Sequence, residues 1–340
     1  MRLRAVCLSV FLFFLTAAGA LAQPQQRFVW PRAGVTEVDI DASVPERLDR
    51  ELKEKLPRVI SLGIVRRGKL VYEYYKEGTS AETPVNVASV TKSVLGFLVA
   101  IAFDKGIFRS ADQKIVEFFP ELAREGLDPR VKSVTLGHML SMMSGWESKD
   151  TDLPPFLALD ALYRPFAYQP GEKFQYDNAT SHLLSIALGR ASGLPVETFA
   201  ERHLFGPMDI ANYTWGRDSE GRVNGWHMLS VTLHDMLKIG QLVVNNGVWQ
   251  GHRVVSEAAM AEMLQRRNDG GPPGNIPYAF QWYVLKTPDG RHPVFAASGY
   301  GGQLLYVVPA LELVIAKTQT RDQRFGDVAF LREIVMKSLR

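Results

Sequence analysis

The sequence predicts an α+β domain in which the two ends of the chain build one sheet and the middle forms a mainly helical part beside it. Short apolar runs typical of strands occur within residues 59–75 and again within residues 279–318. Between these runs, apolar residues recur at helical spacing. We therefore expect a sheet part of about residues 23–108 and 245–340, and a helical insertion of about residues 109–244.

The N-terminal part combines helix and strand signals. The predicted elements are a charged amphipathic helix at Pro45–Leu56, strands at Val59–Val65 and Leu70–Tyr75, and a hairpin turn at Arg66–Lys69 between the strands. A further helix begins near Ser89, where the apolar residues take up helical spacing, and it ends at Gly106.

Helical signals continue to about residue 244, and strand signals return after a long loop. The predicted helices lie at Gln113–Phe119, Val134–Met143, Asn178–Ser192 and Leu233–Val244, with a last one at about Phe325–Leu339. The predicted strands lie at Ala279–Leu285, Val294–Ala297, Gln303–Val308 and Leu313–Thr318. The glycines and prolines of residues 267–277 predict the loop between the two groups.

The first 22 residues have the pattern of a secretory signal peptide. Two arginines are followed by an apolar or small stretch from Ala5 to Ala22, which closes with the small-x-small triplet Ala20-Leu21-Ala22. The stretch also approaches the length of a membrane span, so an uncleaved anchor is the alternative. We expect cleavage after residue 22, because a polar segment follows at once. The protein would then be secreted or periplasmic, with one domain at residues 23–340 and no membrane anchor.

Composition argues against several classes of function. The formal net charge is +3, and Arg2 and Arg4 lie within the signal segment, so we expect no surface for nucleic acid. The single cysteine, Cys7, lies there too, which leaves residues 23–340 without a disulfide or a thiol nucleophile. The histidines form no i, i+4 pair, so we expect structural histidines, no metal site and no cofactor.

The tetrad Ser89-Val90-Thr91-Lys92 opens a predicted helix. Residues three apart lie on one helix face, so the Lys92 amine can reach the Ser89 hydroxyl. The positive potential of a helix N-terminus favours an alkoxide on Ser89 and disfavours an ammonium on Lys92. Both effects make the serine a stronger nucleophile. Taken alone, the tetrad also fits a helix-capping serine followed by a solvated lysine.

Tyr176 and Asn178 form a second candidate pair, in a loop that enters a predicted helix. A phenol near a lysine ammonium has a lowered pKa and can transfer a proton, and this is our expectation for Tyr176. Asn178 offers a donor and an acceptor to a substrate carbonyl or amide. The alternative is a turn in which the asparagine caps the helix.

A glycine-rich segment, Ser298-Gly299-Tyr300-Gly301-Gly302-Gln303, lies between two predicted strands. Glycines permit close approach of a backbone, and N–H groups of a strand edge that point at one place make an oxyanion hole. The alternative is a glycine-rich hairpin turn.

The order of Ser-x-x-Lys, Tyr-x-Asn and the glycine-rich strand motif makes the chain resemble the serine hydrolases related to class C β-lactamases and penicillin-binding D,D-peptidases. The resemblance covers about Glu46 to the end, and residues 134–145 look like the helix before the tyrosine loop of that family. Residues 247–256 and 298–303 look most like the branch with esterases and 6-aminohexanoate-oligomer hydrolases. The implied fold is β-lactamase/transpeptidase-like: an antiparallel sheet flanked by helices, with an inserted mainly helical subdomain.

The resemblance also implies a mechanism without metal or cofactor. Ser89 attacks the substrate carbonyl and becomes acylated, while Lys92 and Tyr176 take the serine proton and return it to the leaving group. The backbone N–H groups of Ser89 and Gln303 form the oxyanion hole, and water then releases the acyl group. The implied substrate-binding positions are Asn178, Tyr300, Gly301, Gly302 and Gln303.

Tyr300 marks a departure from many members of that family. The resemblance implies that many β-lactamases and D,D-peptidases of the family carry Lys or His at this position. A cation there helps to bind the carboxylate of the substrate. A tyrosine offers no positive charge at neutral pH. We therefore expect poor turnover of β-lactams and D,D-peptides, and a preference for uncharged esters or amides. Arg321 is the candidate for a substitute cation.

The interpretation is a secreted serine hydrolase of the esterase or amidase type, acting on a small-molecule substrate. One alternative is a D,D-carboxypeptidase or weak class C-like β-lactamase, and another is a non-hydrolytic penicillin-binding or scaffold homologue. The complete set of Ser89, Lys92, Tyr176 and Asn178 disfavours an inert scaffold. The oligomeric state and the acyl and leaving groups do not follow from the sequence. The aromatic candidates for pocket lining or core are Trp146, Tyr163, Trp226 and Trp282.

Overall fold

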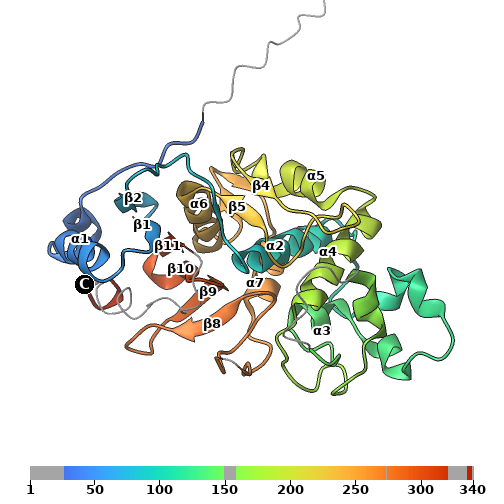
Figure 1. The fold of residues 1–340 in the computed structure, drawn as a ribbon. Coiled ribbons are helices and arrows are strands. Elements are labelled where there is room, and N and C mark those ends of the chain that lie inside the picture. The colour runs from blue at the N-terminus through green and yellow to red at the C-terminus, as the bar shows by residue number, and fades with distance from the viewer. Residues whose placement is uncertain (1–26, 149–157, 273, 321–334, 339–340) are drawn as a thin grey trace, which may run out of the picture.

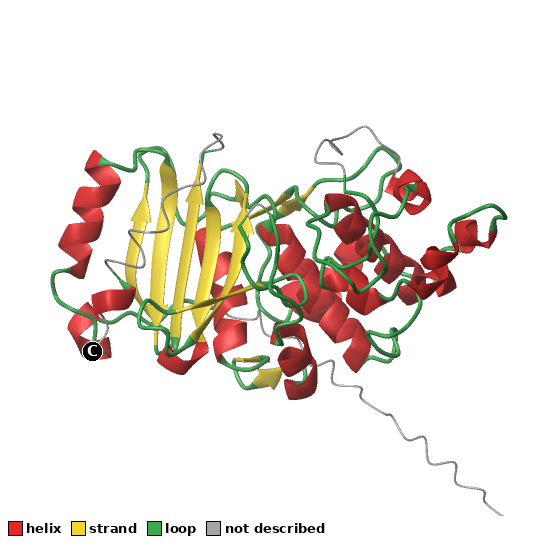
Figure 2. Ribbon diagram, turned by 90° about the horizontal axis from the view of Figure 1, so that it is seen from below, coloured by secondary structure: helices red, strands yellow, loops and turns green. Residues whose placement is uncertain are grey.

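The computed structural model describes residues 27–148, 158–272, 274–320 and 335–338. Its centre is a six-stranded antiparallel sheet with the order β2-β1-β11-β10-β9-β8 (Figure 1). Helices lie on both sides of this sheet, and a mainly helical part extends beyond it (Figure 2). Because β1 (Val59–Arg66) pairs with β11 (Leu313–Gln319), the two ends of the chain meet in one sheet, as predicted.

The other elements have the following bounds. The remaining strands of the large sheet are β2 (Lys69–Tyr75), β8 (Tyr283–Lys286), β9 (Pro293–Gly299) and β10 (Gln303–Val308). Small sheets combine β3 (Val85–Asn86), β5 (Leu229–Val231) and β4 (Thr214–Trp215), and β6 (Val248–Trp249) with β7 (His252–Arg253). The helices are α1 (Val44–Glu54), α2 (Val90–Asp104), α3 (Leu136–Leu140), α4 (Asn178–Ser192), α5 (Val196–Ala200), α6 (Leu233–Val244) and α7 (Glu257–Leu264).

The hairpin between β1 and β2 forms where the sequence predicts it. Arg67 and Gly68 both have left-handed backbones, with φ of 51° and 71°. Positive φ at both central residues is the conformation of a type I′ turn, whose twist matches that of paired strands.

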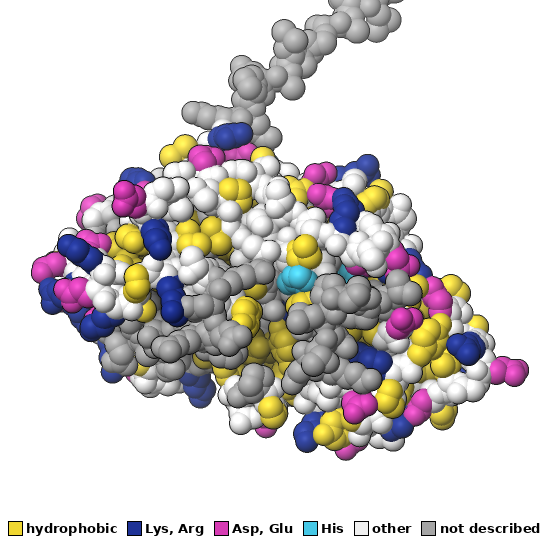
Figure 3. All heavy atoms as spheres, viewed as in Figure 1, with side chains coloured by type: hydrophobic (Ala, Val, Ile, Leu, Met, Phe, Trp, Pro, Cys, Tyr) yellow, Lys and Arg dark blue, Asp and Glu magenta, His cyan; other side chains and the backbone are white. Residues whose placement is uncertain are grey.

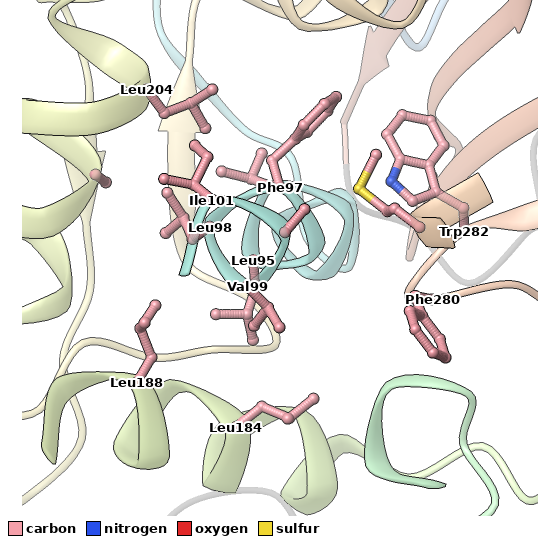
Figure 4. Close-up of a cluster of buried hydrophobic side chains, with 14 of the residues drawn as sticks. Leu95, Phe97, Leu98, Val99, Ile101, Leu184, Leu188, Leu204, Phe280 and Trp282 are labelled. Atoms are coloured by element: carbon pink, nitrogen blue, oxygen red, sulfur yellow. The ribbon is translucent and has the colours of Figure 1, made fainter. Parts of the chain in front are cut away.

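α2 is buried on every side and forms the axis of the helical part. All of its residues from Val90 to Ala102 are buried. Figure 4 shows the side chains that surround it: Leu184 and Leu188 of α4, Leu204, Phe280 and Trp282. A helix that is apolar all round is stable only inside a core. The residues at its N-terminus are therefore held on a rigid element.

The sheet separates two apolar cores, because successive side chains of a strand point to opposite faces. Leu305 and Val307 of β10 belong to the core that contains α2 and α6. Leu304 and Tyr306 belong to the second core, which includes the apolar side of α1. β10 thus contributes side chains to both cores.

Several elements differ from prediction, while α4 and α6 have the predicted bounds. The strand expected from Ala279 begins only at Tyr283, because Gln281 has a left-handed φ of 62°. The helix expected at Gln113–Phe119 is a 3₁₀ turn at Ile115–Glu117, and the helix expected at Val134–Met143 is limited to α3. Most of the helix expected at Phe325–Leu339 lies outside the described residues, which include a 3₁₀ turn at Met336–Ser338.

The surface of the described ranges carries both signs of charge. On the face in Figure 3, basic and acidic side chains are intermixed toward the periphery, and apolar side chains appear near the centre. Within these ranges, none of the helices has the length and apolar character needed to cross a bilayer.

We predict that Gly240 of α6 tolerates no larger side chain. A Cβ there would lie 2.4 Å from Val314 Cγ1 and 3.0 Å from Leu305 Cδ1, so Gly240→Ala should lower the free energy of unfolding by about 1–3 kcal/mol through overpacking. Gly189 of α4 is the matched control, because a Cβ there meets only ordinary contacts at 3.5 Å. Gly189→Ala should be neutral or stabilising by up to about 1 kcal/mol. Urea unfolding of both variants tests this, and equal effects would contradict it.

Candidate active site

Ser89 lies at the N-terminal end of α2, in the N-cap position. Its side chain makes no capping hydrogen bond to the helix backbone, so the hydroxyl is not used to start the helix. The preceding residue, Ala88, has a left-handed φ of 48°, a conformation that costs a non-glycine residue energy and is often kept at functional sites. The sharp turn at Ala88 presents a half-buried serine at the helix end.

Lys92 follows one turn later and is almost fully buried, at 1% exposure. Its Nζ lies 3.1 Å from Ser89 Oγ, 2.8 Å from Asn178 Oδ1 and 3.2 Å from the carbonyl oxygen of Trp226. It also lies 4.8 Å from the ring centroid of Tyr176 and 5.3 Å from that of Trp226. The structure thus brings together the four residues that the sequence singles out.

The surroundings of Lys92 favour the neutral amine. Burial lowers the pKa of Lys92 well below its usual value, and the nearby Asp177 carboxylate opposes this only in part. A neutral amine has two N–H bonds and one lone pair. Because the oxygens of Asn178 and Trp226 are pure acceptors, they take the two N–H bonds. The lone pair is left to face the Ser89 hydroxyl.

Asp177, not Asn178, caps α4. Its carboxylate accepts from the Ala179 N–H at 3.0 Å and from the Thr180 hydroxyl at 2.5 Å. The Arg164 guanidinium donates to the same carboxylate at 2.6 Å, and both side chains are buried. This cap leaves the Asn178 side chain available to Lys92, so the predicted alternative of a capping asparagine is wrong.

The expected lowering of the Tyr176 pKa is also wrong. Burial raises the pKa of the Tyr176 phenol above its usual range, Tyr283 raises it further, and a hydrogen bond with Ser89 opposes the rise. The prediction assumed a lysine ammonium next to the phenol, whereas burial favours the neutral form of both groups. Tyr176 is therefore a protonated phenol, and it lies beside an amine whose surroundings favour the neutral form.

The glycine-rich segment is the hairpin turn between β9 and β10. Gly301 and Gly302 have left-handed φ of 80° and 86°, and Tyr300 at the tip is 52% exposed. Gln303 begins β10 opposite Gly299. Its side chain is fully buried, donating to the Gln319 carbonyl at 2.7 Å and accepting from the Gln319 N–H at 3.1 Å. The predicted alternative of a hairpin turn thus describes this segment.

The Gly299–Tyr300 peptide lies against the segment before Ser89. A Cβ on Gly299 would be 2.4 Å from the Val87 carbonyl oxygen and 3.1 Å from Ala88 Cβ, so only glycine fits there. The Gly299 carbonyl accepts from the Gly302 N–H inside the hairpin at 3.1 Å. In a trans peptide the N–H points opposite to the carbonyl, so the Tyr300 N–H points out of the hairpin, away from β10.

This geometry disfavours Gln303 as the source of the second oxyanion-hole donor. β10 is an interior strand between β9 and β11, so its backbone groups face neighbouring strands. Gln303 lines the cavity described next, but the N–H that leaves the hairpin belongs to Tyr300. The sequence could not separate the two positions, because the direction of an N–H depends on where the hairpin turns.

A cavity of about 270 Å³ opens beside Tyr176 and the glycine-rich turn. Aromatic and aliphatic side chains dominate its wall, and none of the described residues that line it is charged. These residues are Phe174, Tyr176, Gly271, Pro272, Gly274, Ile276, Tyr283, Leu285, Ala296, Ser298, Gly302, Gln303, Leu304 and Tyr306. Arg321, the expected substitute cation, lies outside the described residues.

The aromatic candidates divide between core and site. Trp146 and Trp282 are fully buried core residues, whereas Tyr163 is 39% exposed. Trp226 is buried next to Lys92 and contributes its backbone carbonyl to the site. Among the described residues, no group of His, Cys, Asp or Glu could hold a metal ion.

The fold and these motifs agree with a known family. A family model described as Beta-lactamase matches residues 48–337. The chain belongs to the beta-lactamase family. A 6-aminohexanoate-dimer hydrolase of Paenarthrobacter ureafaciens is 25% identical, with 84% of this chain and 78% of that protein covered. The predicted relationship and the predicted enzyme class, a serine hydrolase, are confirmed.

Solved structures agree on the fold of this family. A family VIII carboxylesterase has a TM-score of 0.72 at 17% identity, covering 87% of this chain and 97% of that one. A penicillin-binding protein homologue of Caulobacter crescentus has a TM-score of 0.71 at 15% identity, covering 86% and 94%. The predicted β-lactamase/transpeptidase-like fold is therefore confirmed.

In this beta-lactamase-family chain, Gln281 joins the helices that carry the site. Its carbonyl accepts from the Ser93 hydroxyl of α2 at 2.7 Å, and its side-chain oxygen accepts from the Ser181 hydroxyl of α4 at 2.9 Å. Its side-chain nitrogen donates to the Leu140 carbonyl at the end of α3 at 2.9 Å. Ser93 follows Lys92, and Ser181 is one turn from Asn178, so Gln281 fixes the distance across which those two residues meet.

We predict that the Arg164–Asp177 pair is needed for stability. Arg164→Met leaves a carboxylate buried without its cation, which should lower the free energy of unfolding by about 3–5 kcal/mol. Arg50→Met is the control, because Arg50 pairs with Glu46 at 2.9 Å on the exposed surface and such pairs contribute less than about 1 kcal/mol. Urea unfolding measures both, and a small loss for Arg164→Met would refute the role of the pair.

Proposed function

We propose that the chain is a serine hydrolase that cleaves uncharged esters or small amides through an acyl-enzyme on Ser89. The observation that carries this proposal is the coordination of Lys92 Nζ, which meets two pure acceptors and the Ser89 hydroxyl. A buried, neutral amine in this arrangement is a base directed at one proton. A helix-capping serine with a solvated lysine would show neither feature.

Acylation uses the lone pair of Lys92. As Ser89 Oγ attacks the substrate carbonyl, its proton passes to Lys92 Nζ, and a bond forms between Oγ and the carbonyl carbon. Negative charge develops on the substrate oxygen, where the backbone N–H groups of Ser89 and Tyr300 can donate hydrogen bonds. Asn178 keeps Lys92 oriented through its side-chain oxygen.

Collapse of the intermediate uses the proton of Tyr176. The phenol gives its proton to the departing oxygen or nitrogen as the bond to the carbonyl carbon breaks. The Lys92 ammonium, formed in the first step, then returns a proton to the phenolate. Both residues are neutral again, and the serine carries the acyl group. Water, deprotonated by the same amine, then attacks the carbonyl carbon of the ester. As the bond between that carbon and Ser89 Oγ breaks, the Lys92 ammonium returns the proton to Oγ and the acid is released.

The cavity supports uncharged substrates. Its described lining offers no cation to a carboxylate and no anion to an ammonium. Moving an unpaired charge out of water costs a free energy on the order of several kcal/mol. The relative from Paenarthrobacter is named for the 6-aminohexanoate dimer, a linear amide with an ammonium and a carboxylate at its ends. We propose that this chain uses the same chemistry on less polar molecules.

We also propose that the protein is exported, with residues 1–22 as a cleaved signal. This rests on the sequence pattern, because the segment lies outside the described residues.

We predict that Ser89→Ala abolishes hydrolysis of p-nitrophenyl butanoate by residues 23–340. The wild-type protein should turn over this ester with a higher kcat/KM than a chromogenic cephalosporin, a D-alanyl-D-alanine peptide or the linear 6-aminohexanoate dimer, because those three carry charges. Steady-state kinetics on all four compounds provide the comparison. Better turnover of the cephalosporin or the peptide would favour a β-lactamase or D,D-peptidase. A burst without turnover on every compound would favour a non-hydrolytic homologue.

We predict that the pH profile of kcat/KM falls on its acid side as the Lys92 amine becomes protonated. The ammonium cannot accept the serine proton, so activity should fall as the pH drops below the pKa of Lys92. Burial lowers this pKa well below its usual value, and the acid limb should therefore lie well below the ordinary pKa of lysine. Lys92→Arg replaces the neutral amine with a permanent cation and so removes the base, and kcat should fall by about 10²–10⁴-fold. A limb near the ordinary pKa of lysine, or an active arginine variant, would refute the assignment.

A further inference from the structure

One contact of Lys92 comes from a part of the chain outside the three motifs. The Trp226 carbonyl accepts from Lys92 Nζ at 3.2 Å, and Trp226 lies in a buried loop between Asn224 and His227. Asn224 Oδ1 accepts from the Trp226 and His227 N–H groups, both at 3.1 Å. Because the direction of the Trp226 carbonyl decides which way the amine turns, the groups that hold this loop affect the base.

The loop rests on α4 at Gly225. A Cβ on Gly225 would lie 2.5 Å from the Ser181 carbonyl oxygen and 2.7 Å from Ser185 Cβ, so the backbone touches the helix directly. At this contact the Gly225 N–H donates to His182 Nδ1 at 3.2 Å. His182 is one turn after Asn178 on the same face of α4. One helix face thus binds Lys92 directly through Asn178 and indirectly through His182.

The second nitrogen of His182 fixes the tautomer. His182 Nε2 lies 2.9 Å from Asp218 Oδ2. Since Nδ1 accepts from Gly225, the ring proton is on Nε2 and is donated to Asp218. Asp218 is held in turn by Arg222, whose Nε donates to Oδ2 at 2.8 Å and whose backbone N–H donates to Oδ1 at 2.9 Å. Burial lowers the pKa of His182, which keeps the ring neutral and Nδ1 able to accept.

We propose that His182 is a positioning residue of the active site: through Gly225 it fixes the Trp226 carbonyl, and that carbonyl turns the lone pair of Lys92 toward Ser89. This inference rests on the proposed role of Lys92 as the base. It assigns to a buried histidine, 3% exposed, a function that none of the sequence motifs indicates. If the Trp226 carbonyl turns away, one N–H of the amine loses its acceptor, and the lone pair is no longer directed at the serine.

Two substitutions separate the contacts of the ring. In His182→Asn, the amide oxygen takes the place of Nδ1 and can accept from Gly225, while the contact with Asp218 is lost. In His182→Gln, the amide nitrogen takes the place of Nε2 and can donate to Asp218, while the acceptor for Gly225 is lost. Ser185→Ala is the matched control: Ser185 lies on the same helix, and its hydroxyl donates to the Val223 carbonyl of the same segment at 3.1 Å.

The experiment measures the acylation rate of each variant with p-nitrophenyl butanoate by stopped flow, labelling of Ser89 by a fluorophosphonate, and the melting temperature. His182→Gln should acylate and label more slowly by on the order of 10–100-fold, with KM little changed. His182→Asn should retain most of the wild-type rate. Ser185→Ala should keep the wild-type rate even if its melting temperature falls.

The outcomes distinguish this inference from the proposed function. If wild type hydrolyses the ester and Ser89→Ala does not, but the Asn and Gln variants acylate equally, the positioning role of His182 is refuted. A loss of rate in all three variants that follows their melting temperatures would likewise make His182 a stability residue only. If wild type neither hydrolyses the ester nor labels at Ser89, the proposed function itself fails.

Discussion

The site depends on one buried amine. Lys92 is surrounded by the core that encloses α2, and burial removes the water that would stabilise its ammonium. The neutral amine then needs acceptors for its two N–H bonds, because unpaired polar groups are costly in a core. Asn178 and Trp226 supply them from two different segments. Within the described part of the chain, the lone pair is left facing the Ser89 hydroxyl, so the proposed direction of proton transfer follows from hydrogen-bond satisfaction.

The architecture keeps those segments in place. α2 is held all round by apolar side chains (Figure 4), and α4 is held at its N-terminus by the buried pair of Asp177 and Arg164. Gln281 joins the two helices through one hydroxyl on each. These contacts cross from α2 to α4 and to the segment before β8. The site is therefore as rigid as the core between the sheet and the helical part.

Local sequence rules predict part of the fold and part of the candidate site. Ser89 and Lys92 share a helix face, so their contact follows from spacing alone, and the bounds of α4 and α6 follow from apolar periodicity. Contacts made by backbone atoms could not be predicted from the sequence. The side chain of Trp226 does not reveal the role of its carbonyl, and the sequence could not decide between the Tyr300 and Gln303 N–H groups, because the direction of each depends on where the hairpin turns. The strand expected before Tyr283 fails for a similar reason: one left-handed residue, Gln281, interrupts an apolar run.

Burial acts in opposite directions on the two proton carriers and gives them complementary roles. Desolvation lowers the pKa of Lys92 and raises that of Tyr176, because it penalises the ammonium and the phenolate alike. One residue thus rests with a lone pair to accept a proton, and the other rests with a proton to give. The same penalty applies to any substrate that brings a charge into the adjoining cavity, whose described lining has no charged side chain. In the proposed function, the environment that favours the neutral forms of Lys92 and Tyr176 therefore also favours uncharged esters and amides, so the protonation states and the proposed substrate preference have one physical cause.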